Sequence, residues 1–196
     1  MADRVVRPEN CGSYQVSKGI NGTVNNRLVV RDQSSLFWLP QETIFYDGGH
    51  LERRLSIDVS SEANALIVEP MLFGRLAMGE HNLSCNLQYC ISLSIDGQLA
   101  FQDATHFSGN ITETLDRPAV LAGARATALV VFSSRIASAV LPKICDMLNE
   151  TSGASVTQDN LLIARLIAPE GMTLRRMLVP IITLLTQTDL PKTWRL

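Results

Sequence analysis

The stretch LSCNLQYCISLSI, from Leu83 to Ile95, decides the fold class of this chain. Apolar or aromatic side chains alternate with polar or small ones along its whole length. Successive side chains of an extended strand point to opposite faces, so this pattern predicts a long β-strand with one buried face. The Asp96-Gly97 pair that follows is typical of a tight hairpin turn and predicts a returning strand from Gln98.

The same period of two recurs on both sides of this stretch. Leu51, Leu55, Ile57 and Val59 share one parity, and charged residues fill the other. Further strands are expected over residues 26–31, 36–39, 43–46, 63–69, 126–132 and 161–168. The last two are apolar on both parities, which is typical of strands buried on both faces.

Two helices are expected in the C-terminal third. Ser134 is the candidate N-cap of a helix whose apolar stripe runs from Ile136 to Leu148, with Pro142 inside it. A second apolar stripe, over residues 174–185, predicts another helix, and the tail over residues 190–196 is expected to be extended. We therefore expect residues 1–196 to form one mainly-β domain with two late helices.

Composition excludes several classes of function. Hydrophobic residues make up 46% of the 196 residues, and the net charge is −2 without any basic block, which argues against nucleic-acid binding. The longest uncharged apolar stretch, Met177 to Leu185, is far shorter than the ~20 residues that span a bilayer. Without a CxxC pair or an apolar leader, a reduced, cytoplasmic protein is expected. The cysteines are Cys11, Cys85, Cys90 and Cys145.

Motifs of catalysis and nucleotide binding are missing from the sequence. There is no phosphate-binding loop, no dinucleotide-binding glycine motif, no nucleophile elbow, and no HExxH or EF-hand pattern. The pairs Arg53-Arg54 and Arg175-Arg176 are expected to lie on solvated faces. These observations favour a protein that is not an enzyme.

Acidic residues stand beside rigid turns in two segments, residues 38–49 and 69–80. Carboxylates in such places can hold a borderline divalent cation loosely, can act as an acid–base pair, or can simply accept structural hydrogen bonds. Glu80 and His81 could offer a carboxylate and an imidazole to such a cation, and the candidates for an acid–base pair are Glu42, Asp47, Glu69 and Glu80. An aromatic beside a glycine and an arginine suits an interface as well as internal packing, and the candidate interface residues are Trp38, Phe73 and Arg75.

Taken in order, these segments resemble the urease accessory protein UreD (UreH) family. The resemblance rests on WLPQETI with DG over residues 38–48, on EPMLFGR and MGE over residues 69–80, and on three later segments. Those segments are RPAVLAGAR over residues 117–125, LRRMLVP over residues 174–180 and LPKTWRL over residues 190–196. Family members are usually longer at the N-terminus, so this chain is expected to lack part of that region and to expose sheet edges.

The resemblance implies a fold and a function. The fold would be stacked β-sheets of solenoid-like, β-helical character with two helices. The function would be that of a urease maturation chaperone in nitrogen metabolism, a scaffold with UreF and UreG for GTP-dependent nickel insertion into apo-urease. It also implies a homodimer of the accessory complex. No cofactor would be tightly bound, and nickel would pass transiently, along Glu42, Asp47, Glu69, Glu80 and His81.

Three rival interpretations remain open. The chain could be a docking scaffold with no metal role, a standalone structural β-protein, or a small hydrolase that uses a carboxylate pair. The absence of a nucleophile or metal motif in the sequence counts against the hydrolase.

Overall fold

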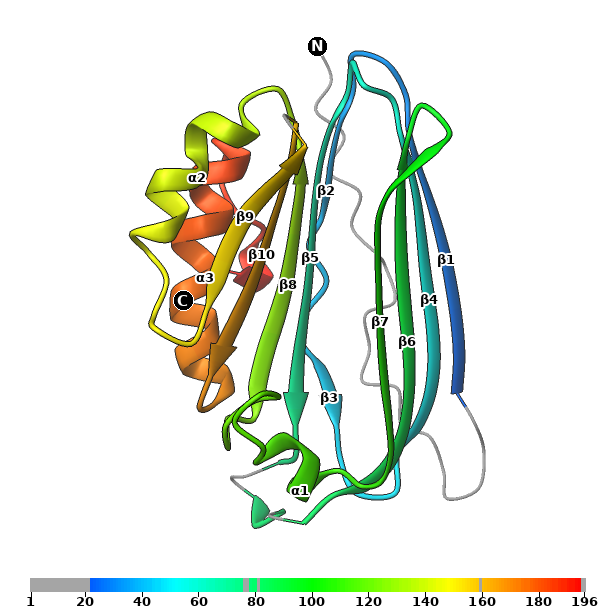
Figure 1. The fold of residues 1–196 in the computed structure, drawn as a ribbon, viewed down its shortest axis with the longest axis vertical. Helices are drawn as coiled ribbons and strands as arrows, with labels where there is room; N and C mark the ends of the chain where they lie inside the picture. The colour runs from blue at the N-terminus through cyan, green and yellow to red at the C-terminus, as the bar shows by residue number, and fades with distance from the viewer. Residues whose placement is uncertain (1–21, 76–77, 81, 159, 195–196) are drawn as a thin grey trace.

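Two facing β-sheets and a layer of helices make up the structure, a computed structural model that describes residues 22–75, 78–80, 82–158 and 160–194 (Figure 1). The first sheet has four strands in the order β1-β4-β6-β7. They are β1 (Gly22–Val30), β4 (His50–Val59), β6 (Ser84–Ile95) and β7 (Gln98–Asn110).

The second sheet has six strands. Its main order is β2-β5-β8-β10-β9, and β3 pairs with β5 beyond the end of β2. The strands are β2 (Ser35–Trp38), β3 (Thr43–Phe45), β5 (Asn64–Phe73), β8 (Ala126–Ser133), β9 (Gly153–Gln158) and β10 (Leu161–Ala168). Helices α2 (Ala137–Cys145) and α3 (Gly171–Thr186) cover the outer face of this sheet, and the short α1 (Thr112–Leu115) lies at one end of the sandwich (Figure 1).

The chain alternates between the sheets over its first half, so β1, β4 and β6 pair in parallel without helical crossovers. The mainly-β class and the two late helices are confirmed. The two sheets are open, with neither closed nor curled, so the solenoid-like character is not shown.

The predicted strands all appear, but three details differ. Strand β5 continues through Pro70 to Phe73 instead of ending at Glu69. Proline has no N–H to donate to a neighbouring strand. Pro70 lies in the gap between β2 and β3, since the pairing of β5 with β2 ends at Ile67 and its pairing with β3 begins at Met71. The returning strand β7 runs to Asn110, and β9, GASVTQ, was not predicted because its short sequence lacks a clear apolar alternation.

The predicted cap of the first helix is wrong. The chain makes a turn after Ser134, and α2 begins after Ile136 without a side-chain cap. Helix α3 begins three residues before the expected start because the carboxylate of Glu170 accepts a hydrogen bond from the Thr173 backbone N–H. A Cβ on Gly171 would lie 2.9 Å from the Leu72 side chain, so glycine lets this helix start close against β5. The tail is not extended, since Lys192–Trp194 forms a 3₁₀ turn.

Two apolar cores hold the layers together. One fills the space between the sheets, and the other lies between the six-stranded sheet and the helices. Strand β5 contributes to both, because Ile67 faces the first core and Leu66 and Val68 face the second. No helix in the described ranges is long and apolar enough to cross a membrane.

Candidate functional site

Three of the predicted acids share one arrangement. Glu42, Glu69 and Glu80 each form an ion pair with an arginine, and each of these arginines lies over an aromatic ring. The three triads are Glu69–Arg53–Tyr89, Glu42–Arg175–Trp194 and Glu80–Arg75–Tyr46. The expectation that Arg53 and Arg175 are solvated is therefore wrong.

The Glu69 triad is buried between the sheets. Arg53 Nη1 lies 2.9 Å from Glu69 Oε2, and Arg53 Nη2 donates to Glu69 Oε1 at 3.1 Å. Trp38 Nε1 donates to the same Oε1 at 2.6 Å. The side chains of Arg53 and Glu69 are only 9% and 1% exposed. Both carboxylate oxygens are thus held by donors in an otherwise apolar core.

Burial and pairing act in opposite directions on the pKa of the Glu69 carboxyl. Burial raises its pKa above the ordinary value, while the nearby charge of Arg53 and the hydrogen bonds from Trp38 and Tyr89 act against that rise. The same burial, together with the charge of Glu69, raises the pKa of the Tyr89 phenol well above its usual range. The Glu69 proton is therefore held more tightly than that of a solvated carboxyl.

Polar groups continue from this triad across the sandwich. Arg53 and Tyr89 are adjacent across the first sheet, and on its far side Asp103 of β7 pairs with Arg165 of β10 at 2.6 Å. Asp103 is near enough for its charge to contribute to the high pKa of Tyr89. On the other side, Arg53 Nη1 donates to Thr43 Oγ1 at 3.2 Å. Thr43, Arg53, Glu69 and Tyr89 thus form a polar row inside the sandwich, and the Asp103–Arg165 pair lies farther across the first sheet.

Two buried polar atoms of this row lack a hydrogen bond of good geometry within the described part of the chain. Arg53 Nε and the Tyr89 hydroxyl are buried, and neither makes a hydrogen bond of full geometry to a described residue. Buried polar groups are usually paired with protein or with an ordered water.

Glu80 and Asp47 meet at one end of the sandwich. Glu80 accepts from Arg75 Nη2 at 2.5 Å and from the Arg75 backbone N–H at 2.9 Å. Hydrogen bonding from Arg75 holds the pKa of Glu80 below its usual value. Asp47 accepts from the Ser84 backbone N–H at 2.8 Å. The two acids therefore tie the loops after β3 and β5 to the start of β6.

Glu42 lies on the helical side of the second sheet. Arg175 Nη1 of α3 donates to it at 2.8 Å, and the guanidinium stacks on Trp194 with 5.0 Å to the ring centroid. Trp194 Nε1 donates to the Leu39 carbonyl at 3.0 Å. Glu42 thus anchors the C-terminal turn rather than joining the buried polar row.

No preformed metal centre occurs in the described part of the chain, where no three His, Cys, Asp or Glu side chains gather. His81 lies outside the described residues, as does Cys11. The other cysteines are free thiols. Burial, assisted by the charge of Asp47, raises the pKa of Cys85 to about 11, so this thiol stays protonated at neutral pH and is a poor metal ligand.

The predicted interface residues fall into two groups. Trp38 and Phe73 are 5% and 1% exposed, and Phe73 packs against the rings of Phe45 and Phe107 inside the sandwich. Arg75 has a side chain that is 46% exposed. The interface role stays a prediction, and Arg75 is the residue that can carry it at the surface.

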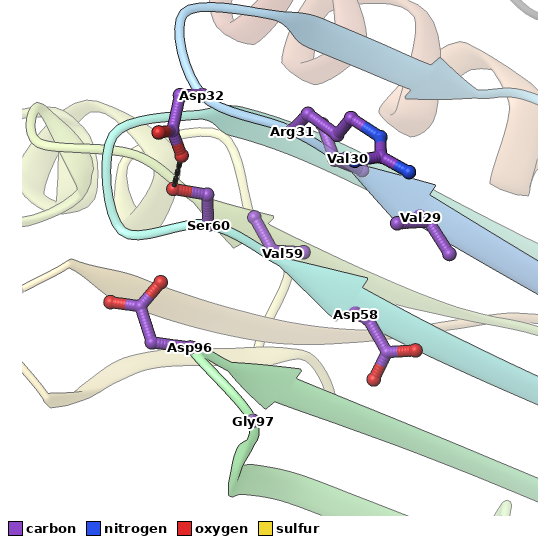
Figure 2. A pocket seen from close by; sticks show the side chains of 9 residues that line it. All are labelled: Val29, Val30, Arg31, Asp32, Asp58, Val59, Ser60, Asp96 and Gly97. Atoms are coloured by element: carbon purple, nitrogen blue, oxygen red, sulfur yellow. Dashed lines mark hydrogen bonds between the residues drawn. The ribbon is translucent and has the colours of Figure 1, made fainter.

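An open depression of about 410 Å³ lies at the end of the first sheet where β1, β4 and β6 finish (Figure 2). Three aspartates line it, but each already has a partner. Asp32 accepts from the Ser60 hydroxyl, Asp58 pairs with Arg27 at 2.9 Å, and Asp96 accepts from the Ser61 backbone N–H at 3.0 Å. These bonds tie together β1, β4 and the turns at their ends, so each aspartate has a structural role.

Sequence reasoning missed Arg53, the partner of Glu69. A signal was present, because Arg53 has the same parity as Leu51 and Leu55 and therefore points into the core. A charged residue on the apolar parity of a strand requires a buried partner. Which acid would supply that partner depends on the packing of one sheet on the other.

Comparison with known proteins identifies the class to which this chain belongs. Residues 11–195 match the UreD urease accessory protein family. The chain is 40% identical to the urease accessory protein UreD of Ruegeria pomeroyi over 93% of this chain and 71% of that protein. The UreD of Roseobacter denitrificans is 39% identical over 94% of this chain and 67% of its own length, and that of Mesorhizobium japonicum is 36% identical over 100% and 71%.

The family match and these relatives define the class, a non-catalytic accessory protein. The chain spans about two thirds of the length of such relatives, from 64% to 71%. It belongs to the UreD urease accessory protein family.

Proposed function

We propose that this chain is a cytoplasmic scaffold that works with UreF and UreG in GTP-dependent nickel insertion into apo-urease. Membership of the family supports a role in urease maturation. The sequence contains no phosphate-binding loop, so GTP hydrolysis falls to a partner. Arg75, exposed beside Tyr46, is the residue we assign to a partner contact, and a homodimer of the accessory complex is part of the same proposal.

We further propose that nickel, as cargo, crosses the chain along acidic groups. The observation that carries this proposal is the carboxylate of Glu69 inside the sandwich, with Arg53, Trp38 and Tyr89 beside it in an otherwise apolar interior. Carboxylates and water bind a borderline divalent ion less tightly than a cluster of thiolates or imidazoles does, which suits a step that must release its ion. Asp47 and Glu80 would serve at one end, and Glu42 and His81 complete the proposed set.

The nickel path predicts a specific defect in living cells. We expect Glu42→Gln together with Glu69→Gln to lower the nickel content of urease severalfold under limiting nickel, while the chain still copurifies with urease and UreF. Glutamine keeps the size of each side chain but removes the anionic ligand. Nickel per urease, measured by mass spectrometry on purified enzyme, is the readout.

Glu52→Gln is the matched control, because Glu52 lies on an exposed strand face with its own arginine partner, Arg54. Normal nickel content in the double variant would remove Glu42 and Glu69 from the path. It would favour the second candidate, a docking scaffold past which nickel travels through other subunits. That candidate is supported by the neutralisation of Glu42, Glu69 and Glu80 by arginines.

A further inference from the structure

We propose that an extended, uncharged segment of a partner protein binds this chain by adding a strand to the first sheet, beside β7 and over β9. This inference rests on the proposed scaffold function. It assigns to that function a place on the chain and a mode of contact, the addition of one strand to an open sheet edge.

The second sheet extends one strand farther than the first sheet on the side of β7. Asp103 of β7 and Arg165 of β10 form an ion pair at 2.6 Å, so β7 lies opposite β10. The first sheet ends at β7, whereas the second continues from β10 to β9 (Figure 1). Among the described residues, no strand of the first sheet covers β9. The sandwich therefore has an unfilled strand position, bounded by the edge of β7 and by the inner face of β9.

The side chains on the inner face of β9 are uncovered, as this arrangement requires. Gly153 and Ser155 of β9 are the cross-strand partners of Arg165 and Ile163 of β10, so they share the inner face of the second sheet. Both are exposed, although the other face of β9 packs against the helical core. The Arg165 side chain is 52% exposed. An added strand of the first sheet would cover all of them.

The free edge of β7 is suited to strand addition. This strand has 13 residues, and it pairs only with β6 among the described strands. Alternate residues of such an edge direct their N–H and C=O groups away from the sheet, and proteins commonly block long edges with lysine or proline. The sequence of β7 contains neither. Phe101 and Phe107 on this strand are only partly buried, so an added strand would bury more of their surface.

The surroundings favour uncharged side chains on the inner face of the added strand. Asp103 and Arg165 neutralise each other, so an ionised side chain placed there would be buried without a counter-charge of its own. Ile163 and Phe107 are apolar neighbours of this position, and Ser155 is small. Small or apolar inward side chains, alternating with polar outward ones, therefore fit best.

A second copy of this chain does not fit the same position. Antiparallel strands of two identical chains are related by a two-fold axis perpendicular to the sheet, so both six-stranded sheets would lie on the same side of the combined sheet. The β9 of each copy would then lie opposite the β7 of the other, where β10 of that copy already packs. This overlap excludes symmetric pairing of two β7 strands and leaves room for one extended segment.

Hydrogen exchange tests the added strand directly. The purified full chain is mixed in turn with UreF, UreG and apo-urease, binding is measured by size-exclusion chromatography, and amide exchange is followed by mass spectrometry. We expect one of these proteins to slow the exchange of β7 amides about tenfold, because its strand accepts hydrogen bonds from them. Strand β1, the other edge of the same sheet, is the internal control and should change little.

Filling the strand position should prevent this binding. Ser155→Trp places a large ring over β9, and we expect it to weaken binding of that partner about tenfold and to remove the protection of β7. Ser56→Trp is the matched control, because Ser56 lies on the exposed outer face of β4. Circular dichroism establishes that both variants are folded.

The outcomes separate this inference from the scaffold function. Binding without added protection in β7, or equal effects of the two tryptophans, would overturn the added strand and leave the scaffold function intact. Failure of all three proteins to bind the unaltered chain would overturn the scaffold function and this inference with it. If Ser155→Trp does not fold, hydrogen exchange of the unaltered chain decides alone.

Discussion

Replacing Arg53 by alanine is expected to lower the free energy of unfolding by about 3–5 kcal/mol, because it leaves the Glu69 carboxylate buried without its counter-charge. The pair is 9% and 1% exposed at its two side chains, so water cannot take the place of the guanidinium without opening the sandwich. Urea unfolding, followed by tryptophan fluorescence, measures the effect. Trp38 donates a hydrogen bond to Glu69, so its fluorescence reports on the site itself.

Arg54→Ala is the control for this experiment. Arg54 is the next residue of the same strand, but its side chain is 67% exposed and its pair with Glu52 is solvated. A surface change of this kind is expected to stay within about 0.5 kcal/mol. Equal effects of the two substitutions would contradict the buried ion pair.

Phe73→Ala should also cost about 3–5 kcal/mol of unfolding free energy, because a large side chain leaves a cavity in a packed core. The Phe73 ring is 1% exposed and lies 5.8 Å from the Phe45 ring and 5.7 Å from the Phe107 ring, centroid to centroid. It therefore joins β5 and β3 of one sheet to β7 of the other. Thermal and urea unfolding measure the loss.

The nearby Met78→Ala is the control for Phe73. Met78 is 74% exposed, so its removal should change stability little. A stable Phe73→Ala chain that no longer bound its partners would contradict the packing role and restore Phe73 as an interface residue.

Local patterns in the sequence predicted the strands because apolar residues of the buried face alternate with polar residues of the exposed face along a half-buried strand. Leu83 to Ile95 and Leu51 to Val59 are long enough for that signal to be clear, and both strands lie where expected. Strand β9 is too short for the signal to be clear, because only Ala154 and Val156 mark its apolar face. The continuation of β5 through Pro70 depends on the gap between β2 and β3, which no local pattern records.

The candidate acids were found from the sequence, but their ion pairs with arginines were not. Glu42 and Glu69 pair with arginines from distant parts of the chain, whereas Glu80 pairs with Arg75 of its own loop. Glu42 and Arg175 are separated by 133 residues, and they meet only because α3 packs on the second sheet. The pairs of Glu42 and Glu69 depend on tertiary packing, so the strand parity could indicate that Arg53 is buried but not which acid it meets.

The three triads have one consequence for the proposed path. A chain that bore free carboxylates in its interior would hold its cation tightly or would lose stability. Pairing each glutamate with an arginine avoids both, and the aromatic ring beside each arginine stabilises its guanidinium.

The most direct test of the central claim is the nickel content of urease in cells that lack this protein. Cells grown with only trace nickel should then make urease that is largely free of nickel, and returning the gene should restore the metal. Fully nickel-loaded urease in the deleted cells would contradict the account.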